Sequence, residues 1–469
     1  MKQMSKIQLV KSDPLFMQEV DTPVVTLEKE DYLLRLNLLV ERIKTCGYTH
    51  AVIYGDREHF SHIEYFTSYD CRFEEALFIV NAAGETAILV GNEGLAYSEQ
   101  IPYPIRRILY QNFSLQGQPK DQLRPLSTLF SELGIGRESK VGLVGVKYFE
   151  SSIEGDPVHT FDLPSYILDG LYRVCPQEQV FQFGQELTGY PDGIRIRLHS
   201  AKEIAWAESA GNRAARAVQR MFKHMKPGMS ELEVSASAGV ELEPLNVHPM
   251  INFGARSVSR GLKSPLQSER LALGQVCGLC YSVRGNLTSK ISVAAYDLNS
   301  WADELKPYYE TFYQAHFAAM AAWYESAKIG VCCGDVYKAV YRHISHEEHG
   351  ITLNPGHSTG TEEWLNSAFC PGSSHKISDG EFVQVDIIAS GSNPVRTSIC
   401  EDAVVFAGER LRAQLREQFP DVYARILARQ KAMREVLGIQ ISDELLPMSN
   451  LNGVYYPFML NLDTVFACR

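Results

Sequence analysis

The sequence predicts two domains, an α/β domain in the first half and an α+β domain in the second. The chain has 469 residues, whereas a single hydrophobic core stops growing near roughly 250–300 residues. Helical and β periodicities alternate along both halves. A polar stretch with several glycines, GQELTGYPDGIRIRLHS, lies between them. We therefore expect domains at residues 1–190 and 195–469.

The first half alternates helical and β-rich segments. A helix is expected from about Glu28 to Cys46, where apolar residues recur at helical spacing and Gly47 follows. The β-rich run THAVIY comes next, followed by YFTSY, ALFIV and TAILVG. The Asn81-Ala-Ala-Gly84 turn between the last two runs suits a hairpin. These segments predict an α/β domain built on a mixed sheet.

The second half opens with a long amphipathic helix, SAKEIAWAESAGNRAARAVQRMFKHM, which Lys226-Pro227-Gly228 ends. Extra helices are expected from 409 to 437, with an interruption at Pro420. Between them the pattern predicts a helix at 231–242, strands near 276–280 and 287–294, a long helix from roughly 298 to 326, and the strands EFVQVDIIA and CEDAVVFA.

Composition and charge exclude several classes of protein. The formal charge of -11 provides no basic field for a phosphate backbone, so nucleic acid is not an expected partner. No apolar window is long enough to cross a membrane, and the N-terminal residues do not resemble a signal peptide, so a cytoplasmic protein is expected. The ten cysteines form no regular framework, and the lone Cys277-x-x-Cys280 pair predicts buried thiols.

Four residues stand out as candidates for chemistry. Asp386 and Glu401 lie within apolar strand sequences, where an unpartnered carboxylate would cost several kcal/mol to bury. His357 lies between glycines that allow close approach of the backbone to a ligand. His248 precedes a proline that holds its backbone extended in a loop. Each also has a structural interpretation, an edge strand for the carboxylates and a turn for the histidines.

The order of motifs from about 195 to 406 resembles the pita-bread family, which includes aminopeptidase P, prolidase and creatinase. The resemblance implies a pita-bread C-terminal domain, a smaller creatinase-like N-terminal domain, and a homodimer. The motifs are, in chain order, Arg197, Ser200-Ala-Lys-Glu-Ile204, Lys226-Pro227-Gly228, Ser230-Glu231, a loop histidine, Gly274, Gly330, Cys333-Gly334-Asp335-Val336-Tyr337, Gly356-His357-x-x-Gly360, Asp379-Gly380 and Glu401-Asp402.

The resemblance implies a degenerate metal site. Metal-dependent members of the family hold two divalent ions with two aspartates, a histidine and two glutamates. The resemblance places His357, Asp386 and Glu401 at the histidine and glutamate positions, whereas the aspartate positions fall near Cys280 and Ser289. With two carboxylates missing, a standard two-metal centre is not expected. Either no metal or one divalent ion (Mn, Fe or Zn) at the three remaining residues is expected.

Creatinase provides a metal-free precedent within the family. By this analogy His248 would act as acid and base, while Asp386 and Glu401 would orient a cationic group of the substrate. Trp364 falls where the family usually has a second histidine, and Asp386 is one methylene shorter than the usual glutamate. The pocket is therefore reshaped relative to creatinase.

We expect further substrate contacts from residues around this site. Cys280, Ser289 and Trp364 occupy positions that line the pocket in the family, and Arg72 is expected to reach a substrate carboxylate from the small domain of the partner subunit. Cys280 as a nucleophile and Arg72 as an ordinary surface arginine are the competing interpretations.

The leading functional prediction is a hydrolase of a small C–N bonded substrate, an amide, amidine or dipeptide, with a creatinase-like His/carboxylate site. One alternative is an Xaa-Pro aminopeptidase or dipeptidase with a mononuclear metal site. Another is a non-catalytic dimeric binding protein on the same fold. A lyase acting on a small zwitterion would use the same residues and stays open.

Overall fold

The computed structural model describes residues 6–239 and 244–469, which form two compact units. The N-terminal unit comprises residues 27–195, and the C-terminal unit comprises residues 6–26 together with 196–469. The sequence prediction assigned residues 1–190 to one domain, but 6–26 belong to the C-terminal unit. The reason is that β1 (Ile7–Lys11) pairs antiparallel with β16 (Thr464–Cys468).

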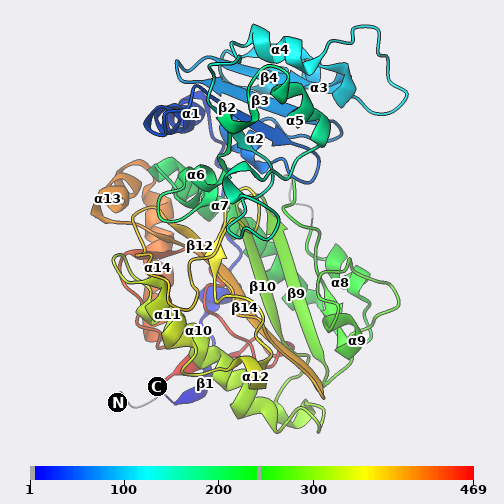
Figure 1. Cartoon of the computed structure of the whole chain (residues 1–469). Coiled ribbons are helices and arrows are strands. Elements are labelled where there is room, and N and C mark those ends of the chain that lie inside the picture. Colours follow the sequence, from blue (N-terminus) through cyan, green and yellow to red (C-terminus); the bar gives the residue numbers. More distant parts are fainter. Residues whose placement is uncertain (1–5, 240–243) are drawn as a thin grey trace. The chain divides into compact units, whose positions relative to one another are not determined.

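The N-terminal unit is a mixed six-stranded sheet in the order β5-β4-β3-β2-β6-β7, with helices on both faces (Figure 1). Side chains along β2 alternate between two cores: Ile53 packs with α1 and α2, and Val52 packs with α4 and α5. The strands are β2 (His50–Gly55), β3 (Ala76–Asn81), β4 (Thr86–Val90), β5 (Arg106–Leu109), β6 (Val141–Val144) and β7 (Val180–Gln182). The helices are α1 (Lys29–Thr45), α2 (Ser61–Thr67), α3 (Asn92–Tyr97), α4 (Leu126–Glu132), α5 (Ser165–Tyr172) and α6 (Gly184–Thr188).

The predicted first helix and the β3–β4 hairpin are confirmed, as is the α/β class of this unit. The run YFTSY differs, because Tyr65 and Phe66 lie in helix α2 rather than in a strand. Tertiary packing overrides the β preference of these aromatic residues. Arg35 of α1 donates to the carbonyl of Tyr65 at 2.9 Å and lies 4.0 Å from the centre of its ring. The helix therefore forms where it can pack against α1.

The C-terminal unit is built on a sheet in the order β11-β12-β14-β10-β9-β8, with β13 and β15 also paired to β14 (Figure 1). Helix α7 packs on β9 and β10. The strands are β8 (Asn252–Phe253), β9 (Val276–Val283), β10 (Asn286–Val293), β11 (His357–Ser358), β12 (Phe382–Val385), β13 (Ala389–Ser392), β14 (Val395–Phe406) and β15 (Leu445–Pro447). The helices are α7 (Ala201–His224), α8 (Glu231–Ala236), α9 (Gly254–Val258), α10 (Ala315–Ser326), α11 (Cys333–Val340), α12 (His346–His349), α13 (Glu409–Gln418) and α14 (Pro420–Glu435).

The α+β class of this unit, the long helix α7 and the break before Pro420 are confirmed. The helix predicted from about 298 is wrong at its start. A π-helical segment, Tyr309–Gln314, leads into α10, because Pro307 cannot donate a backbone hydrogen bond to a preceding turn. The helix predicted at 231–242 ends at Ala236, and residues 240–243 lie outside the described residues.

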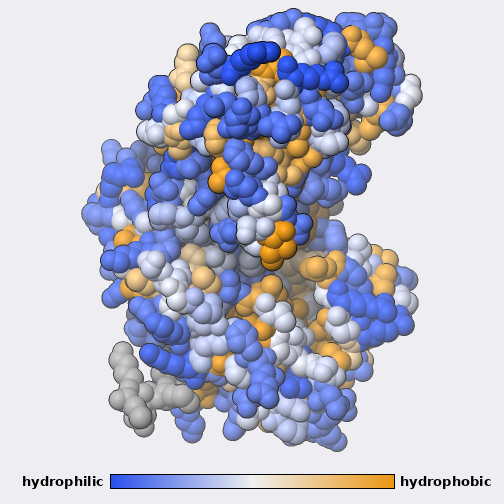
Figure 2. All heavy atoms as spheres, in the orientation of Figure 1, coloured by the Kyte–Doolittle hydropathy of each residue, from blue (hydrophilic) through white to orange (hydrophobic). Residues whose placement is uncertain are grey.

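Within the described ranges, no helix is both long and apolar enough to cross a membrane. On the face of the molecule shown in Figure 2, hydrophilic side chains predominate and apolar ones occur in small groups. The ten cysteines are all free thiols, in agreement with the scattered pattern in the sequence.

A buried ion cluster fastens α14 to α7. The Glu208 carboxylate accepts two hydrogen bonds of 2.8 Å from Arg425 and one of 2.8 Å from Arg429. Burial alone would raise the pKa of Glu208, but the two guanidinium groups hold it below its usual value. Because this pKa is lowered on folding, the pair stabilises the protein above the ordinary carboxyl pKa. The contribution is lost as the pH falls through the folded value.

Glu208→Gln is therefore expected to destabilise the C-terminal unit by about 3–5 kcal/mol at neutral pH, because the buried Arg429 and the partly exposed Arg425 lose their counter-ion. All four tryptophans lie in this unit, so urea titrations followed by tryptophan fluorescence report on it. The difference from wild type should shrink below pH ~4. Glu409→Gln, which breaks the exposed Arg412 pair, serves as the control and should cost at most about 1 kcal/mol. An equal loss in both variants would contradict the assignment.

Candidate active site and metal-binding residues

Neighbouring strands place the predicted site residues on one face of the sheet. Cys280 of β9 is opposite Ser289 of β10, and Ser289 is opposite Glu401 of β14. The short turn between β9 and β10 is made at Gly285, which has a φ of 97° that favours glycine. Asp386 directly follows β12, whose last residue pairs with β14 next to Glu401. His357 begins β11 at the edge of the same strands.

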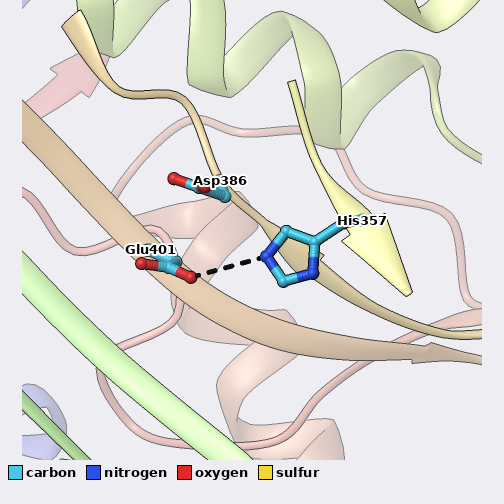
Figure 3. Close-up of side chains that lie close together, drawn as sticks. All are labelled: His357, Asp386 and Glu401. Atoms are coloured by element: carbon cyan, nitrogen blue, oxygen red, sulfur yellow. Dashed lines mark ion pairs between the residues drawn. The ribbon is translucent and has the colours of Figure 1, made fainter. Parts of the chain in front are cut away.

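The structure brings His357, Asp386 and Glu401 together. One ligand atom from each residue lies within 4.8 Å of the others, and all three residues are buried. Figure 3 shows the imidazole directed at Glu401, with the Asp386 carboxyl nearby. His357 Nε2 lies 3.8 Å from Glu401 Oε1. The fold thus gathers into one cluster three residues that are spread over more than 40 positions of the sequence, from 357 to 401.

Sequence reasoning missed a fourth member of this cluster, Glu363. Its Oε1 lies 3.0 Å from His357 Nε2. The two atoms are close enough for an ion pair, but they do not meet the geometry of a hydrogen bond. Trp364, the next residue, stacks on the His357 ring with centroids 4.0 Å apart and remains 40% exposed. The available signal was the acidic pair Glu362-Glu363 immediately before the predicted pocket residue Trp364. Trp364 therefore covers the imidazole, and Glu363 approaches it at its ring nitrogen.

Burial and mutual repulsion control the protonation of the cluster. Burial lowers the pKa of His357, but Glu363, Glu401 and Asp386 together raise it to about 10. Burial raises the pKa of Asp386 to about 7. Burial and the neighbouring Asp386 raise the pKa of Glu401 well above its usual value. Three carboxyl groups around one imidazole thus hold more negative charge than the site can balance without bound protons or a cation.

The donor set fits a single divalent cation. Within the described residues, His357 Nε2 and Asp386 Oδ1 are buried and have no hydrogen-bond partner. Buried polar atoms normally have one, and a metal ion would satisfy both atoms. The other ring nitrogen, Nδ1, lies 3.1 Å from the Ser358 carbonyl. A proton on Nδ1 donated to this carbonyl would leave Nε2 free as a ligand.

A family model matches the part of the chain that carries this cluster. The family model described as metallopeptidase family M24 matches residues 205–405. Residues 205–405 form an M24 domain. No curated protein sequence gives a significant match to the chain.

Solved structures confirm the pita-bread fold with an N-terminal α/β domain, as the resemblance implied. A prolidase from Thermococcus sibiricus is 13% identical with a TM-score of 0.62, and covers 81% of this chain and 95% of its own. Dipeptidase PepE from Mycobacterium ulcerans is 14% identical with a TM-score of 0.60, covering 81% and 94%. An Xaa-Pro dipeptidase from Bacillus anthracis is 13% identical with a TM-score of 0.56, covering 81% and 96%. At these identities the shared property is the fold.

Neutral side chains occupy the positions in this M24 domain where the resemblance implied aspartates. Burial, and then the charge of Glu401, raise the pKa of the Cys280 thiol well above its usual value, so the thiol stays protonated. Reactive cysteines have lowered pKa values, so this environment does not favour Cys280 as a nucleophile. Over residues 6–239 and 244–469, His357, Asp386 and Glu401 are the one group of three possible metal ligands.

Two other predicted residues are not members of this group. His248 is exposed in the loop before β8, and its Nε2 lies 2.9 Å from the Leu262 carbonyl. Arg72 belongs to the N-terminal unit, where its Nε lies 2.7 Å from Asp70 Oδ2 and about half of its side chain is exposed. His248 therefore does not join the His357 group, and the expectation that Arg72 reaches the site of a partner subunit stays a prediction.

The side chain of Asp402, the neighbour of Glu401, lies on the opposite face of the sheet of the M24 domain. Side chains alternate along β14, so Glu401 points to the site and Asp402 points away from it. Lys290 Nζ donates to Asp402 Oδ2 at 2.6 Å and to the Leu451 carbonyl at 2.8 Å. Both side chains are buried. The Glu401-Asp402 pair therefore combines a site residue with a structural ion pair behind it.

Proposed function

We propose that this protein is a hydrolase that cleaves the C–N bond of a small dipeptide-like substrate. In this proposal, a mononuclear metal centre is held by His357, Asp386 and Glu401. The observation that supports it is the buried cluster, the one such group among the described residues, in which an imidazole nitrogen and a carboxylate oxygen have no hydrogen-bond partner. One histidine and two carboxylates suit Mn²⁺, Fe²⁺ or Zn²⁺. A second ion is not proposed, because Cys280 and Ser289 provide no charge to offset its dehydration.

A bound divalent ion would act as a Lewis acid and lower the pKa of a water molecule. The chain's own residues would do the rest. Glu363 is the one carboxyl of the cluster with an appreciably exposed side chain, at 22%. It is therefore placed to take a proton from the attacking water at Oε1 and to deliver it to the leaving nitrogen. Trp364 would limit the entry of bulk water by covering His357.

A metal-independent reaction of the creatinase type would need His248 close to the carboxylates. The contact between His248 and the Leu262 carbonyl gives no support to that role. The absence of a hydrogen-bond partner at His357 Nε2 and at Asp386 Oδ1 favours the metal-dependent alternative.

The metal requirement can be tested on the purified full-length protein. We expect elemental analysis to find about one divalent ion per chain, as a single three-ligand site allows. Removal of the ion with a chelator should abolish turnover of a dipeptide panel that includes Xaa-Pro substrates, and Mn²⁺, Fe²⁺ or Zn²⁺ should restore it. Undiminished turnover after chelation would refute the metal dependence. Two ions per chain would refute the mononuclear centre, and no turnover with any metal would refute the hydrolase.

A further inference from the structure

A second candidate site lies in the N-terminal unit, among residues that the proposed function does not use. A cavity of about 540 Å³ opens there, within the size range of small-molecule sites. Glu75, Tyr110, Leu126, Tyr166, Asp169 and Arg173 line it, among others. No residue of the His357 cluster contributes to its wall.

Glu75 provides a carboxylate that neighbouring hydroxyl groups hold in place in this cavity. Its Oε1 lies 2.9 Å from the hydroxyl of Tyr54 and 2.9 Å from the hydroxyl of Tyr166. Burial and the charge of Glu75 raise the pKa of both tyrosines, so both phenols stay protonated and donate to the carboxylate. Among the residues that the structure describes, no lysine, arginine or histidine pairs with Glu75. One carboxylate oxygen is thus fixed by two phenols while the charge has no counter-ion.

Charges of both signs stand at the edge of the same cavity. Asp169 on α5 and Arg173 at its C-terminal end are exposed and one helical turn apart. In the described part of the chain, neither forms an ion pair with the other or with another residue. The wall between them is rigid, because a Cβ on Gly170 would meet Leu126 Cβ at 2.8 Å. Helices α4 and α5 therefore pack closely at the point of α5 from which these two side chains extend.

We propose that this cavity binds a small zwitterion of the amino-acid type. The ammonium group would pair with Glu75, and the carboxylate would pair with Arg173. Charge-assisted hydrogen bonds of this kind are about twice as strong as neutral ones. A plain anion would meet Glu75 and Asp169, and a plain cation would meet Arg173, so a molecule with both charges fits best. Leu126 and the ring of Tyr110 would contact its apolar part.

The test uses the full-length protein and the proteinogenic L-amino acids one by one, at millimolar concentration, in a thermal-shift assay. At least one amino acid should raise the melting temperature, because a ligand that binds the folded state stabilises it. Calorimetry should then give a dissociation constant that weakens at least ~10-fold in both Glu75→Gln and Arg173→Gln, since each loses one charged contact. The glutamine at 75 keeps an oxygen that can accept from the two phenols.

Matched controls separate this site from its surroundings and from the proposed active site. Arg137→Gln and Glu138→Gln change exposed charges of the same unit outside the cavity, and should leave binding unchanged. N-acetyl and amide derivatives of the bound amino acid should both bind more weakly. The proposal is overturned if no amino acid binds, or if binding is unchanged in Glu75→Gln. It is also overturned if binding is lost in His357→Ala alone, which would assign the amino acid to the proposed active site.

Discussion

His357→Ala is expected to lower the affinity for Mn²⁺, Fe²⁺ and Zn²⁺ by at least ~100-fold, because loss even of an indirect partner of a metal ligand costs 10–100-fold. Turnover of any dipeptide substrate should fall with it. The remaining Asp386 and Glu401 would have to hold the ion as two carboxylates alone, without the imidazole ligand. Calorimetric titration of the metal-free protein measures the affinity, and elemental analysis measures the occupancy.

His316→Asn provides the matched control. His316 is as buried as His357, but its ring nitrogens lie 2.8 Å from the Ile387 carbonyl and 2.9 Å from Ser398 Oγ. Its replacement should therefore cost stability without changing metal affinity. Equal loss of metal in both variants would mean that His357→Ala acts through unfolding. Full metal affinity in folded His357→Ala would exclude His357 as a ligand.

The parts of the fold that the sequence predicted are those with local signals. Helix α7 has helical periodicity over its whole length, and the hairpin of β9 and β10 has two strand-like segments joined at Gly285. The pairing of β1 with β16 could not be predicted, because Ile7 and Cys468 face each other across nearly the whole chain. No local pattern specifies such a partner.

In the candidate site too, the residues with a local signal in the sequence could be predicted and the others could not. Asp386 and Glu401 could be recognised because a charge within an apolar strand is costly unless it has a partner. Glu363 could not, because its place depends on a turn that brings the chain back toward β11. That turn is held by hydrogen bonds from Ser358 N to the Asn366 carbonyl at 2.7 Å and from Leu365 N to the Ser358 carbonyl at 3.0 Å. The sequence between Ser358 and Asn366 has neither helical nor strand periodicity, so the acidic pair within it could be noticed but its return toward His357 could not be predicted.

The ion pair behind the site is expected to make a large contribution to stability. Lys290→Met leaves Asp402 buried without its cation, and breaking such a pair costs about 3–5 kcal/mol. Burial raises the pKa of Asp402 to about 6 even beside Lys290. Without the lysine the carboxyl should therefore take up a proton, which places the loss toward the lower end of that range. Urea unfolding followed by tryptophan fluorescence, which reports on the C-terminal unit, measures it.

The double variant Lys290→Met/Asp402→Asn tests whether the loss comes from the uncompensated charge. Asparagine keeps an oxygen that can accept from Gly453 N, which lies 3.2 Å from the Asp402 carboxylate, and it removes the charge. We expect the double variant to recover more than half of the stability that Lys290→Met loses, because replacing both partners of a buried pair costs far less than removing one. Metal occupancy should stay near the wild-type value in the double variant, since Glu401 points to the other face of β14. A double variant no more stable than Lys290→Met would show that packing of the lysine side chain, rather than its charge, holds this face of the sheet.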